Sequence, residues 1–100
     1  MKTTKGKANV FSDLGFSLAE ARNLQMRSQL MTALRKFIEK ERLTQAAAAK
    51  RLKVTQPRMS DLMRGKISRF SIDTLVTMSG DAGLEVDLRI TAKPVSRRVA

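Results

Sequence analysis

The sequence predicts a mainly α-helical domain, a bundle of about four to five helices with one β-strand near the C-terminus. Apolar residues recur at the spacing of one helix face between Leu30 and Ile38, and serine or threonine precedes each further helical stretch. From Leu84 to Ile90 the apolar residues instead alternate with polar ones, which is the period of a half-buried strand. A length of 100 residues is enough for one small domain.

Changes in composition at both ends of the chain set the expected domain limits. Residues 1–9 and 92–100 are basic and lack periodicity, so we expect flexible tails around a domain at residues 10–91. The chain has no cysteine, which fits a reducing compartment. No apolar run resembles a membrane span or a signal peptide, so we expect a cytoplasmic protein with no membrane partner.

The first long helix is expected to run from Leu18 to about Arg42. Ser17 and Glu20 have the spacing of a capping box, in which each side chain accepts a hydrogen bond from the backbone N–H of the other residue. The apolar stripe is less regular in the first half, so the pattern allows a break near Arg27–Ser28, and Arg27 is expected to face water. Two methionines of this helix are expected to fill gaps, either in the core, which we favour, or in a contact with a partner: Met26 and Met31.

Two short helices joined by a tight turn are expected between Thr44 and Lys66. Thr44 and Thr55 can each cap a helix through the side-chain hydroxyl, and Pro57 falls in the first turn of the second helix, where its missing N–H does no harm. Four alanines at positions 46–49 allow the two helices to cross closely, and Gly65 stands where a helix C-cap often lies. Caps, small residues at the crossing and a short turn together are typical of a DNA-binding helix-turn-helix.

A further short helix is expected after this motif. Phe70 is expected to close the bottom of the core, and Ser71 to cap a helix from Ile72 to about Ser79. The residues of this helix expected to pack inward are Leu75, Val76 and Met78.

The positive charge is unevenly distributed along the chain. The net charge is +11, and residues 50–69 hold seven basic residues and one acidic residue. Residues 71–92 instead hold four acidic residues and one basic residue. A cationic helix-turn-helix with cationic tails indicates a protein that binds a polyanion, here double-stranded DNA.

A family resemblance is carried by the stretch LTQAAAAKRLKVTQPRMSDLMRGK, which is similar to the helix-turn-helix of the phage-repressor superfamily of XRE and Cro-like regulators. Over residues 10–91 the chain also resembles small HigA-type antitoxins of bacterial toxin–antitoxin pairs, through VFSDLGF, NLQMRSQLM and FSIDTLVTMSGDAGLEVDLRI. Lys53 departs from the pattern, since this turn position is commonly glycine in the superfamily. The resemblance implies a phage-repressor-like bundle, and a homodimeric repressor that is also an antitoxin and regulates its own operon.

The resemblance also implies a partner, a small ribonuclease-like toxin, for which the region of residues 10–29 is the expected surface. Two alternatives stay open from the sequence. One is a stand-alone phage-type repressor with no toxin. The other is a protein-binding module that neutralises a toxin and binds DNA only secondarily.

In the helix-turn-helix geometry the start of the second helix enters the major groove of an operator, which is expected to be an inverted repeat. Gln56 suits the bidentate pattern of adenine, and Arg58 suits guanine or a phosphate. Gln45 and Thr55 are expected to hydrogen-bond phosphates. DNA binding would also associate the protein with the nucleoid. The residues expected to contact DNA are Gln45, Thr55, Gln56, Pro57, Arg58, Ser60, Asp61, Arg64, Lys66 and Arg69.

The predicted strand needs a pairing partner, because a lone strand leaves its backbone N–H and C=O groups unpaired. The candidates are the same strand of a second subunit, which we favour, the patch at residues 9–11, or an edge of a partner protein. Centring a two-fold pair on Leu88 sets Asp87 against Arg89 and Val86 against Ile90, and it avoids like charges face to face. The expected dimer-interface residues are Leu84, Val86, Asp87, Leu88, Arg89 and Ile90.

The composition argues against catalysis. The chain has no His, Cys, Tyr or Trp, which removes the usual general base, the thiol nucleophile and the soft metal ligands. We therefore expect no enzyme activity, no cofactor and no metal site, and we interpret Asp81, Glu85 and Asp87 as a solvated face. The four phenylalanines are expected in the core, which disfavours RNA stacking.

Overall fold

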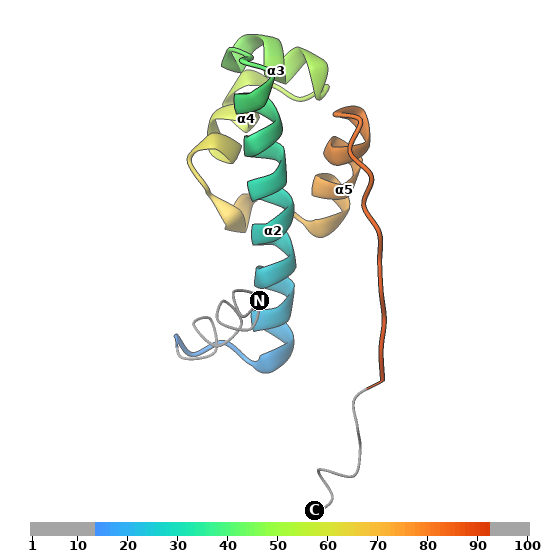
Figure 1. The fold of residues 1–100 in the computed structure, drawn as a ribbon. Helices are drawn as coiled ribbons and strands as arrows, with labels where there is room; N and C mark the ends of the chain where they lie inside the picture. Colours follow the sequence, from blue (N-terminus) through green and yellow to red (C-terminus); the bar gives the residue numbers. More distant parts are fainter. Residues whose placement is uncertain (1–13, 93–100) are drawn as a thin grey trace, which may run out of the picture.

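The computed structural model describes residues 14–92. Four α-helices and one 3-10 helix follow one another in this range: α2 (Leu18–Lys40), α3 (Gln45–Arg51), α4 (Gln56–Met63), η1 (Ile67–Arg69) and α5 (Ile72–Asp81). The long helix α2 forms the axis of the molecule, with α3 and α4 packed across one end of it and α5 beside it (Figure 1). The predicted mainly helical architecture is confirmed.

A serine or threonine hydroxyl begins each described α-helix, as the sequence predicts. The Ser17 Oγ accepts from the Glu20 N–H at 3.1 Å and the Glu20 Oε1 accepts from the Ser17 N–H at 2.9 Å, which completes the capping box. Thr44, Thr55 and Ser71 cap α3, α4 and α5 in the same way, through the N–H three residues later at 3.1, 3.3 and 3.1 Å. The start of every described α-helix is therefore fixed by local hydrogen bonds.

Helix α2 is continuous, so the break allowed near Arg27–Ser28 is wrong. At that point the Arg27 Nε donates to the Asn23 Oδ1 at 2.7 Å, one turn back along the helix, which braces the segment. The helix ends at Lys40, two residues before the predicted limit, and Arg42 then adopts a left-handed conformation with φ 54°.

The core lies between α2, α3, α4 and α5 and is aliphatic, with one aromatic side chain at its base. Phe70 is buried as predicted, and Leu34, Leu62 and Leu75 are fully buried with it. Three expected core residues are instead exposed: Val76 at 40%, Met26 at 41% and Phe16 at 42%. Val76 and Met26 line a surface groove between α2 and α5, and Phe16 precedes the first turn of α2. Helical spacing alone cannot distinguish a side chain in a surface groove from one in the core.

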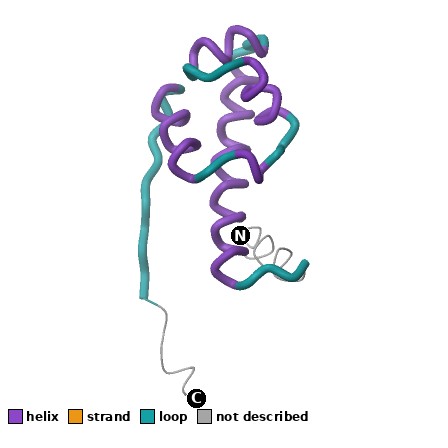
Figure 2. The backbone as a smooth tube through the Cα atoms, turned by 180° about the vertical axis from the view of Figure 1, so that it is seen from behind, coloured by secondary structure: helices purple, strands orange, loops and turns teal. Residues whose placement is uncertain are grey.

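No β-strand is present among residues 14–92, and the segment predicted as a strand runs as an extended chain beside α2 and α5 (Figures 1 and 2). Leu84 is partly buried against the core, whereas Leu88 and Ile90 are 79% and 83% exposed. An extended segment becomes a strand only when another backbone supplies the ladder of hydrogen bonds. The predicted strand is therefore not observed in the single chain, and its pairing across a dimer stays a prediction.

The N-terminal patch at residues 9–11 and both predicted tails, apart from Ala92, lie outside the described residues. Within the described range, no helix has the length and apolarity needed to span a bilayer.

Candidate nucleic-acid interface

The turn between α3 and α4 is built by small side chains and one left-handed residue. Ala48 and Ala49 are buried at 0% and 6% exposure, which lets the two helices cross closely as predicted. Lys53 adopts φ 58°, the conformation for which glycine is favoured, and the Val54 N–H then donates to the Ala49 carbonyl at 2.9 Å. These contacts give the motif its fixed crossing of two helices.

The first turn of α4 is presented to solvent. Thr55, Gln56 and Pro57 are exposed, and Ser60, one turn later, is half-buried. Gln45 is exposed at the start of α3. Four residues of the predicted DNA set therefore lie at accessible helix starts, where backbone N–H groups and polar side chains can meet an anion: Gln45, Thr55, Gln56 and Pro57.

Two other residues of that set, Arg58 and Asp61, are turned toward the molecule. The Arg58 guanidinium lies 4.8 Å from the centroid of the Phe70 ring and donates to the carbonyl oxygen of Arg69 at 3.0 Å. The Asp61 carboxylate accepts from the guanidinium of Arg69 at 3.2 Å, and its side chain is only 16% exposed. Both side chains, Arg58 and Asp61, therefore already contact other residues of the same chain.

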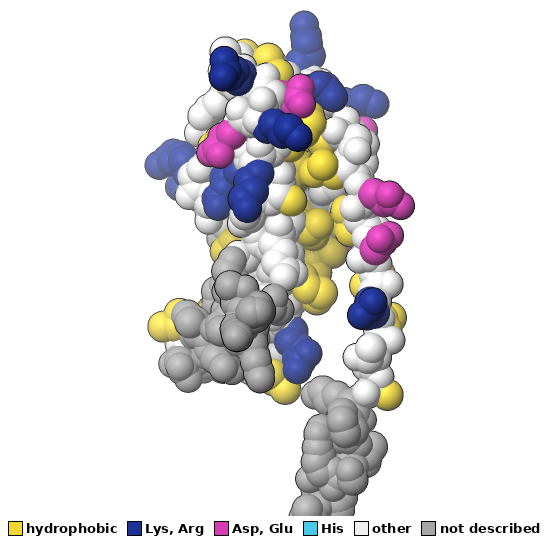
Figure 3. Space-filling model, in the orientation of Figure 1, with side chains coloured by type: hydrophobic (Ala, Val, Ile, Leu, Met, Phe, Trp, Pro, Cys, Tyr) yellow, Lys and Arg dark blue, Asp and Glu magenta, His cyan; other side chains and the backbone are white. Residues whose placement is uncertain are grey.

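The basic residues that follow α4 surround the η1 loop, which we define as residues 66–70. Arg64 is the C-cap of α4 and is exposed, and Gly65 follows with φ 71°, in agreement with the predicted glycine stop. Lys66 is half-buried and Arg69 is exposed. Figure 3 shows Lys and Arg side chains gathered over the end of the molecule where α3 and α4 lie, with fewer Asp and Glu side chains among them. We call this the cationic end.

Sequence reasoning missed one arginine of this region. Arg27, expected to face water, donates through one guanidinium nitrogen to the carbonyl oxygens of Ile67 and Phe70, each at 3.2 Å. It thereby joins α2 to the η1 loop across forty residues of sequence. No local pattern signals such a contact, because a polar residue on a helix face reads as solvent-exposed until its tertiary neighbour is known.

Residues 14–92 contain no group of three or more His, Cys, Asp or Glu side chains that could hold a metal ion. The only charged pairs within ion-pair distance in this range are Arg69–Asp61 and Lys53–Asp81, the latter at 3.7 Å. The interface is thus an array of exposed polar helix starts and cationic side chains.

Comparison with known proteins agrees with this geometry. A family model described as a helix-turn-helix domain matches residues 10–91. A solved structure provisionally assigned as an XRE-family transcriptional regulator is 38% identical, with a TM-score of 0.71, over 78% of this chain and 88% of that chain. No curated protein sequence matches the chain. The chain therefore belongs to the helix-turn-helix family, and its motif is of the XRE type.

Proposed function

We propose that this protein is a sequence-specific, DNA-binding transcriptional repressor and the antitoxin of a toxin–antitoxin pair whose operon it regulates. The observation that carries the DNA-binding part is the exposed first turn of α4 at the cationic end of a helix-turn-helix. In this motif that turn enters the major groove, while the surrounding lysines and arginines neutralise phosphates.

The residues divide into base-reading and phosphate-binding groups. Gln56, exposed in the first turn of α4, is the proposed adenine reader, since its amide can donate and accept at one base edge. Gln45 and Thr55 bind phosphates at the two helix starts, and Arg64 and Lys66 bind the flanking backbone. Gln56→Ala should therefore lose discrimination at one base pair by about 1–3 kcal/mol, whereas Arg64→Ala should weaken all sequences about equally.

We propose a homodimer joined through the segment at residues 84–92. Val86, Leu88 and Ile90 are 43%, 79% and 83% exposed, so an apolar face lies uncovered beside a backbone that pairs with no strand in the described chain. An antiparallel pair centred on Leu88 would cover these side chains and oppose Asp87 to Arg89. Such a dimer would set the two recognition helices about 34 Å apart, or a multiple of it, to reach successive major grooves.

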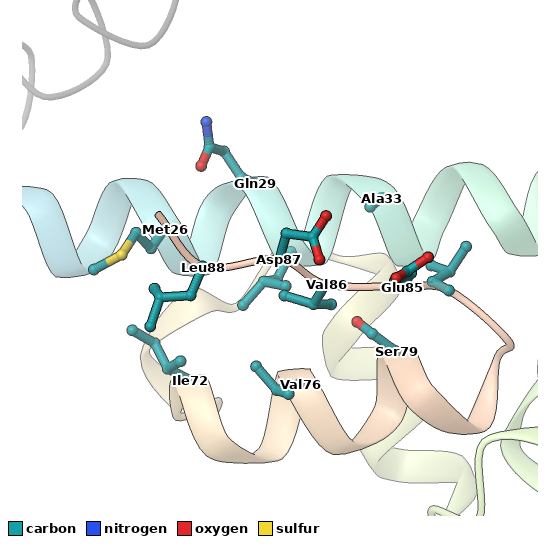
Figure 4. A pocket seen from close by; sticks show the side chains of 12 residues that line it. Met26, Gln29, Ala33, Ile72, Val76, Ser79, Glu85, Val86, Asp87 and Leu88 are labelled. Carbon is teal, nitrogen blue, oxygen red and sulfur yellow. The ribbon is translucent and has the colours of Figure 1, made fainter. Parts of the chain in front are cut away.

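The groove between α2, α5 and this segment supports the same arrangement (Figure 4). Val86 and Leu88 lie on the side of the segment that faces Ile72 and Val76, while the Asp87 carboxylate points the other way. The segment thus keeps the two-sided character of a strand, with one apolar side and one polar side.

The antitoxin part comes from the family resemblance, and an exposed apolar surface at the N-terminal end of α2 supports it. Leu14, Phe16 and Leu18 are 69%, 42% and 51% exposed within the region expected to bind the toxin. Clustered apolar side chains at a surface are typical of protein-binding sites. A stand-alone repressor would leave this surface without a partner.

The decisive experiment is a binding assay with the chain's own promoter DNA, with and without the product of a neighbouring gene for a small basic protein. Affinity should fall steeply with ionic strength, by a log–log slope of about 0.9 for each phosphate contact. Nearly salt-independent binding would contradict the electrostatic interface. Normal DNA binding with no effect of the neighbouring gene product would leave the stand-alone repressor as the function.

A further inference from the structure

The η1 loop is held by arginine side chains from two different helices. Arg27 of α2 donates to the Ile67 and Phe70 carbonyl oxygens at 3.2 Å, and Arg58 of α4 donates to the Arg69 carbonyl oxygen at 3.0 Å. Three carbonyls of one short loop therefore each receive a guanidinium N–H. A planar guanidinium with several fixed donors is better suited to such hydrogen bonds with backbone carbonyls than the ammonium group of lysine is.

A third link joins the loop to α4. Asp61 lies one turn after Arg58 on α4, and its carboxylate accepts from the Arg69 guanidinium at 3.2 Å. The Arg69 side chain is still 56% exposed, so this contact orients its guanidinium without burying it. The side of α4 that carries Arg58 and Asp61 thus contacts the η1 loop.

The contacts of Arg58 compete with reading a base. Its guanidinium stacks 4.8 Å from the centroid of Phe70, a ring that is only 1% exposed, and it would have to leave both the ring and the Arg69 carbonyl to reach a base edge. Gln56, Ser60 and Arg64 follow one another at intervals of four residues and so share another face of α4, on which Gln56 and Arg64 are exposed and Ser60 is half-buried. The two faces of the helix therefore have different tasks.

We infer that Arg58 and Asp61 are positioning residues, which fix the η1 loop against α4 so that Lys66 and Arg69 meet phosphates while Gln56 meets its base pair. This inference rests on the proposed DNA binding and revises the expectation that Arg58 and Asp61 touch bases. It assigns the specificity of α4 to Gln56 and Ser60, with Arg64 as the phosphate anchor beside them.

A first test needs no DNA. The Arg69 and Phe70 amides donate to the Lys66 and Ile67 carbonyls at 3.0 and 3.2 Å, so their hydrogen exchange reports on the order of the η1 loop. In Arg58→Met these two amides should exchange at least about tenfold faster, with exchange in α5 unchanged. Gln56→Ala, on the other face of α4, is the matched control and should change neither. Equal exchange in Arg58→Met and the wild type would overturn the inference.

A second variant guards against a general loss of stability. Arg58→Lys keeps the positive charge but loses the planar fork that reaches ring and carbonyl together. It should still speed exchange at the Arg69 and Phe70 amides and weaken DNA binding. Wild-type amide exchange and wild-type DNA affinity in Arg58→Lys would mean that only the positive charge of Arg58 matters. That result would also overturn the inference.

The test with DNA uses the operator and a set of its single-base variants. Arg58→Met should weaken every sequence by the same factor, about tenfold, and lower the salt slope by about 0.9, because the Arg69 phosphate contact is lost with the position of the loop. Arg69→Ala should then cost less in the Arg58→Met background than in the wild type.

Two outcomes would contradict this result. A loss confined to one base pair would make Arg58 a base reader, and strictly additive losses would make Arg58 and Arg69 independent. Failure of the wild-type chain to bind the promoter would instead contradict the proposed function, and the exchange test would still decide whether Arg58 orders the loop.

Discussion

Two regions of this chain carry equally clear patterns in the sequence and reach different states in the structure. The helix-turn-helix, from Thr44 to the η1 loop, has capped helices, a buried crossing at Ala48 and a loop gripped by side chains from α2 and α4. The segment at residues 84–92 has a regular alternation of apolar and polar residues, yet it makes no strand and exposes Leu88.

The difference lies in where the required partners are. A helix makes its backbone hydrogen bonds within itself, and threonine hydroxyls close its first turn, so the pattern is satisfied wherever the chain goes. A strand depends on a second backbone, which the described chain does not supply. The helix-turn-helix is thus complete in one subunit, whereas we expect the segment to be completed by another.

The largest expected effect contrasts one leucine from each region, buried in the helix-turn-helix and exposed in the segment. Leu62→Ala, at 0% exposure, should lower the free energy of unfolding by about 2–5 kcal/mol, because it leaves a cavity in the hydrophobic core. Leu88→Ala, at 79% exposure, should change it by less than about 0.5 kcal/mol in the monomer. Urea unfolding followed by circular dichroism, at concentrations that favour the monomer, measures both. Similar losses for the two variants would mean that the segment packs in the single chain.

The next effect tests completion of the segment by a second subunit. Leu88→Asp should give monomers by analytical ultracentrifugation and weaken operator binding about a hundredfold, because the two half-sites are then bound without avidity. Leu14→Asp makes the same chemical change at a leucine that is 69% exposed and distant in sequence, and it should leave both properties unchanged. A dimeric Leu88→Asp variant with normal operator affinity would favour an edge on a partner protein as the place where the segment pairs.

A smaller effect is expected from a cap of the helix-turn-helix. Thr55→Ala removes the hydroxyl that accepts from the Arg58 N–H, and it should cost about 0.5–2 kcal/mol of stability. Thr91→Ala, in the segment, lies at the start of no described helix and should be near neutral. Thermal unfolding compares the two, and an equal change in melting temperature would show that the hydroxyl of Thr55 contributes nothing through capping.

The smallest effect concerns the backbone of the turn. Lys53→Gly should stabilise the protein by about 0.5–1 kcal/mol, because φ 58° strains any residue with a Cβ. The ion pair with Asp81 that is lost is worth little, since the lysine side chain is 77% exposed. Gly83→Ala, at φ 83°, is the reverse change and should destabilise by about 1 kcal/mol. Calorimetry of both variants measures the sign, and destabilisation by Lys53→Gly would contradict the assigned strain.

Prediction from sequence succeeded where the cause is local. The cap residues and the burial of Phe70 follow from short-range spacing and were confirmed. The helix-turn-helix family was also confirmed. The DNA-contacting residues and the dimer register stay predictions.

Prediction failed where a contact joins distant residues. The hydrogen bond from Arg27 to the η1 loop joins residues forty positions apart. The groove lined by Val76 exists only once α2 and α5 lie side by side. Periodicity places such residues on a face of a helix, but it cannot say whether that face meets a loop, a groove or the core.

The hydroxyl caps have a consequence for the time course of folding. Ser17, Thr44, Thr55 and Ser71 each accept a hydrogen bond from the backbone N–H three residues later. Because these contacts are local in sequence, each of the four α-helices can begin to form before distant parts of the chain meet. Small helical domains of this kind fold in microseconds to milliseconds, whereas subunit encounter takes milliseconds or longer and depends on concentration. The helix-turn-helix should therefore be folded before a second subunit binds. At low expression we expect folded single subunits in which the segment at residues 84–92 is still unpaired.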